Sequence, residues 1–133
     1  MKQSWHINDW RLYLVLDRAF VGTRSCLDIA RAALAGGVNV IQYRDKTSPD
    51  AVFRTEASAV LQLCRDRGIP FIVNDRARIA AALGADGVHV GQDDMPARAV
   101  RRIAGPDCVI GVSAASREQA RRAEADAADY IGA

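Results

Sequence analysis

The feature that most constrains the fold is a regular alternation of short β-branched runs with longer amphipathic segments. The apolar runs read LYLVL, VNVIQY, FIV, GVHV, CVIGV and DYIG, at residues 12–16, 38–43, 71–73, 87–90, 108–112 and 129–132. Strands that alternate with helix-length segments are typical of βαβ units. The sequence therefore predicts an α/β fold with a parallel sheet.

The segments between the strands carry helix start and stop signals. Ser25 and Asp28 form a capping box before a helix that ends near residue 35, and Ser116 and Gln119 form another. Ser48 and Pro49 are expected to open the longest helix, whose apolar face is formed by Phe53, Ala57, Val60, Leu61 and Cys64. Further helices are expected at 77–83 and 96–103.

Two architectures share this rhythm, an open doubly wound sheet and a (β/α)8 TIM barrel. No Gly-x-Gly-x-x-Gly turn follows the first strand, which disfavours a dinucleotide-binding sheet. The chain has 133 residues, whereas a complete barrel takes about 250. We therefore expect residues 1–133 to form a single partial TIM-barrel domain, truncated after about five and a half βα units.

Composition limits the classes of partner. There are 18 basic and 16 acidic residues, a net charge of +2, which gives no indication of a nucleic-acid partner. Cys26, Cys64 and Cys108 are scattered singly, as expected for buried thiols in a reducing compartment. The N-terminus lacks the apolar region of a signal peptide, and no apolar run approaches the roughly 18 residues of a membrane span. We expect a cytoplasmic protein that acts on small molecules.

Polar residues follow the second strand in an alternating pattern. Gln42, Arg44 and Lys46 lie two residues apart, so an extended backbone would point them to one face and Asp45 to the other. An amide, a planar guanidinium and a mobile ammonium suit a pyrophosphate. The alternative is that Arg44 and Lys46 are ordinary exposed loop residues.

Acidic residues follow the third and fourth strands. Asp75 and Asp94 could supply two carboxylates to an octahedral Mg²⁺ site completed by phosphate oxygens and water. Both also lie where helix N-caps belong, so capping is the competing interpretation. Asp93 is an equal candidate for the ligand after the fourth strand.

Further polar residues end or interrupt other strands. Ser113 follows the fifth strand and could bind a phosphate oxygen or be a simple turn residue. His89 lies inside the fourth strand, where an interior histidine with satisfied hydrogen bonds is expected rather than a catalytic one. Asp17 ends the first strand. It either lies on the same rim as the other polar residues at strand ends or forms a turn.

Together these segments resemble the thiamine phosphate synthase/TenI family. QYRDK resembles its Gln-x-Arg-x-Lys signature, and FIVNDR resembles its strand ending in Asn-Asp. GADGVHVGQDDMPARAVRRI resembles its segment in which a strand is followed by Gly-Gln-acid-Asp. GPDCVIGVSA and DADYIG are similar to its next two strands. The resemblance runs from about Leu12 to Gly132, and these five segments occur in the family's order and spacing.

The resemblance implies a (β/α)8 barrel and a transferase of thiamine biosynthesis. The family joins hydroxymethylpyrimidine pyrophosphate to thiazole phosphate, which gives thiamine phosphate and pyrophosphate. It implies that Asp75 and Asp94 bind Mg²⁺ and that the substrate-binding residues are Gln42, Arg44, Lys46, Asn74 and Ser113. Arg44, Lys46 and Ser113 would act in catalysis by stabilising the departing pyrophosphate.

Two departures keep other hypotheses open. Ala115 stands where the related thiazole tautomerases carry a histidine, which favours the synthase over a tautomerase-like barrel. The short chain lacks the later family loops, so we expect it to be inactive alone. A non-catalytic pyrophosphate-binding remnant, or a fragment completed by a partner chain, is the main alternative. The sequence leaves open whether the chain forms a homo-oligomer.

Overall fold

The computed structural model describes residues 5–133. The chain divides into two compact units, Met1–Ile72 and Val73–Ala133. The boundary lies inside strand β3 (Phe71–Asn74), so this strand contributes residues to both units.

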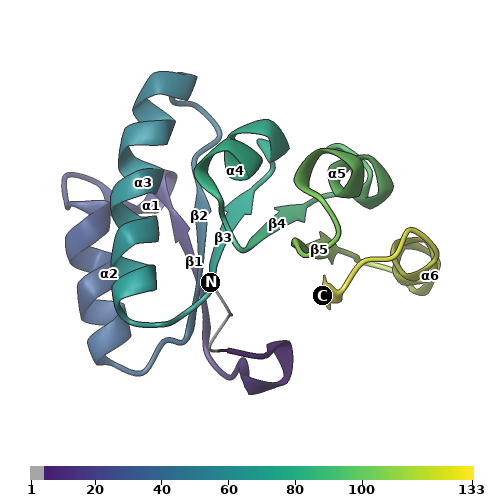
Figure 1. Ribbon diagram of the computed structural model, residues 1–133, viewed down its shortest axis with the longest axis horizontal. Coiled ribbons are helices and arrows are strands. Elements are labelled where there is room, and N and C mark those ends of the chain that lie inside the picture. The colour runs from purple at the N-terminus through teal and green to yellow at the C-terminus, as the bar shows by residue number, and fades with distance from the viewer. Residues whose placement is uncertain (1–4) are drawn as a thin grey trace. The chain divides into compact units, whose positions relative to one another are not determined.

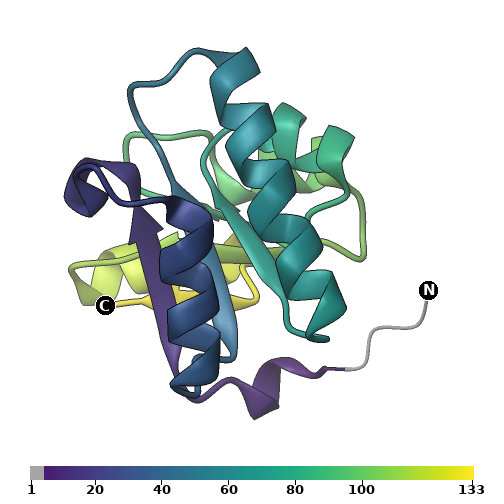
Figure 2. The ribbon, with the colours of Figure 1, turned by 90° about the vertical axis from the view of Figure 1, so that its left-hand side faces the viewer.

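The first unit contains two complete parallel strands and the helices that cover them. Its elements are η1 (Ile7–Asp9), β1 (Tyr13–Asp17), α1 (Arg18–Val21), α2 (Cys26–Ala35), β2 (Val40–Arg44) and α3 (Asp50–Asp66). β1 pairs with β2 in a register that sets Asp17 opposite Arg44. Helices α2 and α3 lie side by side over one face of these strands (Figures 1 and 2). The two strands therefore end at one edge.

The second unit repeats the same alternation. After the end of β3 come α4 (Ala77–Leu83), β4 (Gly87–Val90), α5 (Ala97–Ala104), β5 (Val109–Ser113), α6 (Arg117–Ala125) and β6 (Tyr130–Gly132) (Figure 1). β5 pairs in parallel with β4 on one side and with β6 on the other. The sheet order follows the sequence from β1 to β6, as expected for consecutive βαβ units.

The buried residues explain why these segments form these elements. Phe53, Ala57, Val60, Leu61 and Cys64, the predicted apolar face of α3, are all buried. Every residue of β3 and β4 is buried as well, which is typical of parallel strands covered by helices. None of the helices within residues 5–133 combines the length and the apolar character needed to cross a bilayer.

The predicted α/β alternation is confirmed, with boundaries shifted by one or two residues at most ends. The Ser25 cap is present, since its side chain accepts a hydrogen bond from the Asp28 amide. The predicted Ser48 cap is wrong, because α3 is preceded by Pro49 and no side chain caps it. Two short elements were not predicted: η1, and α1, which Asp17 caps by accepting from the Ala19 amide.

One arginine joins three segments of the second unit. Arg101, in the last turn of α5, donates to the carbonyl oxygens of Pro106, Cys108 and Ala127. It also forms an ion pair with Asp129, whose carboxylate accepts from the Ile110 amide at 2.8 Å. Arg101 therefore ties the end of α5 to the start of β5 and to the loop before β6.

We predict that Arg101→Met lowers the free energy of unfolding by about 2 kcal/mol, because it removes charge-assisted hydrogen bonds to several backbone carbonyls. Arg102→Met is the matched control, since Arg102 is an exposed residue of the same helix. Urea denaturation followed by circular dichroism measures both. Equal stability of the two variants would show that the Arg101 contacts contribute nothing.

Candidate functional site

Two predicted residues of β2 contact partners on β1, Gln42 from the middle of the strand and Arg44 from its carboxyl end. The Gln42 amide donates to the Tyr13 hydroxyl at 2.8 Å, and the Gln42 side chain is 3% exposed. Arg44 donates to the Asp17 carboxylate, which is largely buried, while Arg44 is about one-third exposed. The ion pair therefore fixes the Arg44 guanidinium at the carboxyl end of β2, so Arg44 is not an ordinary loop residue.

The backbone that follows β2 is ordered by a buried acid. Asp45 is 2% exposed, and its Oδ1 accepts from the amides of Thr47 and Ser48 at 3.1 and 3.0 Å. Such a turn is common where an aspartate ends a strand. Lys46 lies between these residues and is exposed. Asp45 thus shapes the loop that carries Lys46, a role that the alternation pattern did not indicate.

The end of β3 presents polar groups without partners. Asn74 is 7% exposed, yet no residue in the described range gives its amide a hydrogen bond. The Asp75 carboxylate, which is half-buried, is likewise unpaired among residues 5–133. The amide atoms of Asn74 are not among the fully buried side-chain atoms that lack a hydrogen bond in the described part of the chain, so they are open to water or to a ligand.

The backbone at this point is strained. Asp75 and Arg76 have φ angles of 56° and 34°, in the left-handed region that non-glycine residues rarely adopt. The Asp75 amide donates to the His89 carbonyl at 2.8 Å. Two such residues in succession are found chiefly where a binding site requires them.

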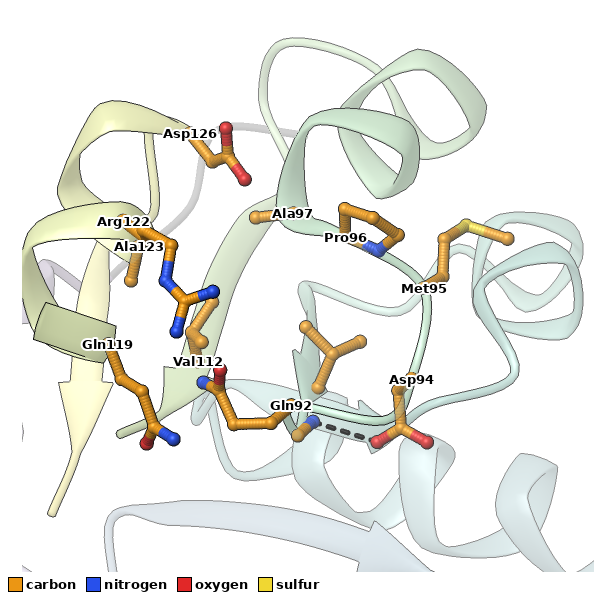
Figure 3. A pocket seen from close by; sticks show the side chains of 12 residues that line it. Gln92, Asp94, Met95, Pro96, Ala97, Val112, Gln119, Arg122, Ala123 and Asp126 are labelled. Carbon is orange, nitrogen blue, oxygen red and sulfur yellow. Dashed lines mark hydrogen bonds between the residues drawn. The ribbon is translucent and has the colours of Figure 1, made fainter. Parts of the chain in front are cut away.

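The capping interpretation of the two acids is wrong. The N-cap positions of α4 and α5 are Arg76 and Pro96, and neither helix has a side-chain cap. Asp94 instead accepts from the Gly91 amide at 2.7 Å, within the loop after β4 (Figure 3). Neither carboxylate therefore caps the helix that follows it.

The carboxylates of Asp75 and Asp94 could supply only part of the coordination shell of a hard cation. Within residues 5–133 no group of three or more His, Cys, Asp or Glu side chains could enclose a metal. Mg²⁺ commonly takes one or two protein carboxylates and completes its shell with water and phosphate oxygens. Asp75 and Asp94 match that requirement, and the exposed Asp93 follows the same strand.

A chain of side-chain hydrogen bonds crosses β4, β5 and β6. His89 Nε2 lies 2.7 Å from Ser113 Oγ, and His89 Nδ1 lies 3.0 Å from the Tyr130 hydroxyl. His89 is 8% exposed and Ser113 is exposed. Burial lowers the pKa of His89, and the charge of Asp94 partly opposes that shift. The expectation of a satisfied interior histidine is confirmed, but its partner is a predicted site residue.

A cavity of about 180 Å³ lies between α5 and α6. Figure 3 shows Arg122 and Gln119 of α6 facing Gln92 of the loop after β4 across this space. Its apolar lining includes Val112 and Ala123. Of the predicted site residues only Asp94 lines it, and Gln92, which also lines it, donates to the Ser113 carbonyl at 2.7 Å.

The structure thus places Gln42, Arg44 and Lys46 in the first unit and Asn74, Asp75, Asp94 and Ser113 in the second. Sequence reasoning missed the partners that hold them. Asp17 and His89 were noted without these contacts, and Tyr13 and Tyr130 were not singled out. Their spacing along the chain carries no signal, because each contact depends on strand register.

Comparison with known proteins identifies the relatives. The family model described as thiamine monophosphate synthase matches residues 12–133. A thiamine-phosphate synthase of Roseiflexus castenholzii is 52% identical over 120 residues, which cover 90% of this chain and 53% of the relative. One from Moorella thermoacetica is 46% identical over 123 residues, covering 92% and 59%. The chain spans little more than half the length of these relatives.

A solved structure agrees in fold. The thiamine phosphate pyrophosphorylase from Pyrococcus furiosus superposes with a TM-score of 0.84 at 37% identity, over 92% of this chain and 59% of that one. The match of the family model, residues 12–133, includes all five of the segments quoted above. The chain therefore belongs to the thiamine monophosphate synthase family.

Proposed function

We propose that this chain carries the pyrophosphate-binding part of a thiamine phosphate synthase. The substrates would be hydroxymethylpyrimidine pyrophosphate and thiazole phosphate. The observation that supports this most directly is the end of β3, where no hydrogen bond joins the Asn74 amide or the Asp75 carboxylate to another described side chain and both groups are open to a ligand. Unpaired polar groups at the carboxyl end of a parallel strand are typical of a ligand site.

The residues divide by the chemistry they would supply. Gln42, Arg44, Lys46, Asn74 and Ser113 would bind the pyrimidine pyrophosphate, and Asp75 and Asp94 would hold Mg²⁺. When bound, the cation would neutralise charge on the pyrophosphate oxygens. Arg44 has a planar fork for two of these oxygens, whereas Lys46 offers a mobile point charge.

The proposed reaction requires no protein nucleophile. The C–O bond between the pyrimidine methylene and pyrophosphate breaks, and the thiazole nitrogen forms the new C–N bond. Negative charge builds on the departing pyrophosphate, where Arg44, Lys46 and Ser113 would stabilise it through preorganised donors. The active groups would therefore act by charge and position.

The complete architecture belongs to this proposal as well. We infer that β1 to β6 are the first six strands of an eight-stranded TIM barrel, and that residues 1–133 form one partial domain of it. The similarity to the Pyrococcus furiosus structure over 59% of that chain supports this inference. The tautomerase-like alternative is not favoured, since the relatives named above are synthases and Ala115 replaces the histidine.

The overall test is turnover by the chain alone and by a fusion to the remaining residues of the Roseiflexus castenholzii relative. We expect thiamine phosphate from the fusion with Mg²⁺ and none from the 133-residue chain. Pyrophosphate binding by both without product from either would support the non-catalytic remnant. Isomerisation of the thiazole without pyrimidine substrate would support the tautomerase, and turnover by the short chain would show that the later loops are dispensable.

We predict that Asp75→Asn and Asp94→Asn each weaken Mg²⁺-dependent binding of inorganic pyrophosphate at least about tenfold. Asparagine keeps the shape of both residues, tolerates the left-handed backbone at 75 and still accepts the Gly91 amide at 94. Isothermal titration calorimetry with and without Mg²⁺ measures the effect. Asp93→Asn is the control, and a larger loss from it would assign the ligand to Asp93.

We predict that Arg44→Ala weakens pyrophosphate binding roughly 10- to 100-fold, the value of charge-assisted hydrogen bonds from one guanidinium. Arg54→Ala is the matched control, because Arg54 is an exposed arginine of α3. The same calorimetry measures both variants. Equal affinities would return Arg44 to the class of ordinary surface charges.

A further inference from the structure

Two glycines make room for the hydrogen-bonded group of Ser113, His89 and Tyr130. A Cβ atom at Gly111 would overlap the ring of Tyr130, which crosses over this position of β5. A Cβ atom at Gly132 would approach His89 Cε1 to 3.3 Å, tighter than most packing contacts. The ring centroids of His89 and Tyr130 lie 5.5 Å apart. The neighbouring strands therefore accommodate this side-chain group closely.

The residues of this hydrogen-bonded group differ in their exposure to solvent. The His89 ring is almost entirely buried, whereas Ser113 at the end of β5 is exposed. Each ring nitrogen has one hydroxyl partner, at 3.0 Å for Tyr130 and 2.7 Å for Ser113. The ring thus connects a half-buried tyrosine of β6 to Ser113, the most exposed member of the group.

The proton on the imidazole decides what Ser113 offers. A neutral imidazole has one donor nitrogen and one acceptor nitrogen. If Nδ1 carries the proton, Ser113 donates to Nε2 and turns only lone pairs outward. If Nε2 carries it, Tyr130 donates to Nδ1, Nε2 donates to Ser113 Oγ, and the serine proton remains for a ligand.

We propose that Tyr130 and His89 are positioning residues that fix the second arrangement, so that Ser113 presents its hydroxyl proton to an anionic oxygen. This inference rests on the proposed function, because pyrophosphate oxygens only accept hydrogen bonds. Ser113 touches the ligand, while His89 and Tyr130 act through it. The phenol supplies the donor that holds the proton on Nε2.

The first experiment determines the tautomer without any ligand. ¹⁵N NMR of the imidazole in the full chain at neutral pH reports which nitrogen carries the proton, and His89→Gln separates its signals from those of His6. We expect Nε2–H for His89 and a larger Nδ1–H population in Tyr130→Phe. A proton on Nδ1 in the unaltered chain would overturn the proposal, whether or not pyrophosphate binds.

The second experiment is a double-mutant cycle on the binding of inorganic pyrophosphate with Mg²⁺. Tyr130→Phe should weaken binding roughly fivefold, the value of one ordinary hydrogen bond. In a Ser113→Ala background the same change should have no effect, because the tyrosine acts only through the serine. Equal losses in both backgrounds would reveal a general structural role and refute the proposal.

Controls separate this result from misfolding and from failure of the proposed function. His89→Gln keeps an N–H near the Nε2 position and should retain more affinity than His89→Leu, with thermal melts to confirm folding. Tyr43→Phe also loses a buried hydroxyl contact, the 2.6 Å bond to Glu56, and should leave affinity unchanged. If the unaltered chain binds no pyrophosphate, the proposed function is wrong. The tautomer of His89 would still show whether Tyr130 and His89 orient the Ser113 hydroxyl.

Discussion

Hydrogen bonds between parallel strands bring consecutive carboxyl ends to the same edge of each unit. In the first unit this register sets Asp17 beside Arg44. In the second it aligns His89 with Gly111 and Ser113 with Gly132. Polar residues separated by 20 or more positions in the chain meet only through this pairing, so the proposed chemistry depends on it.

The strand edge also explains why these polar residues are tolerated. The strands β2, β3 and β4 are largely buried. Even so, β1, β2, β3 and β5 end in side chains that can donate, accept or carry charge, which are Asp17, Arg44, Asn74 and Ser113. Arg44 is held by Asp17, whereas Asn74 and Asp75 have no partner among the described residues. Some polar side chains at the strand ends are thus fixed by bonds to other residues, whereas others can form hydrogen bonds to a ligand.

The sequence predicted the elements well because their signals are local. Gly36 and Gly37 after α2, the Ser116 cap and the period of the α3 face each require only nearby residues. The short α1 was missed, since one turn has no periodicity and its cap, Asp17, also ends a strand. The capping assignments of Asp75 and Asp94 failed because a residue before a helix can equally belong to the preceding loop.

The polar partners were beyond sequence reasoning for a different reason. The Tyr13–Gln42 and His89–Tyr130 contacts join residues on different strands, and only the register decides which side chains face each other. Asp45 illustrates the point within a single loop. The alternating pattern placed it on the opposite face from Arg44, but its buried turn with Thr47 and Ser48 depends on backbone geometry.

The ring of Tyr130 occupies the space that Gly111 leaves on the adjacent strand. These two positions are therefore sterically coupled: a methyl group gained at 111 would have to be accompanied by a smaller residue at 130. Such a double replacement would also remove the phenol that contacts His89. A chain with a larger residue at 111 would then need a different way to orient the serine at the end of β5.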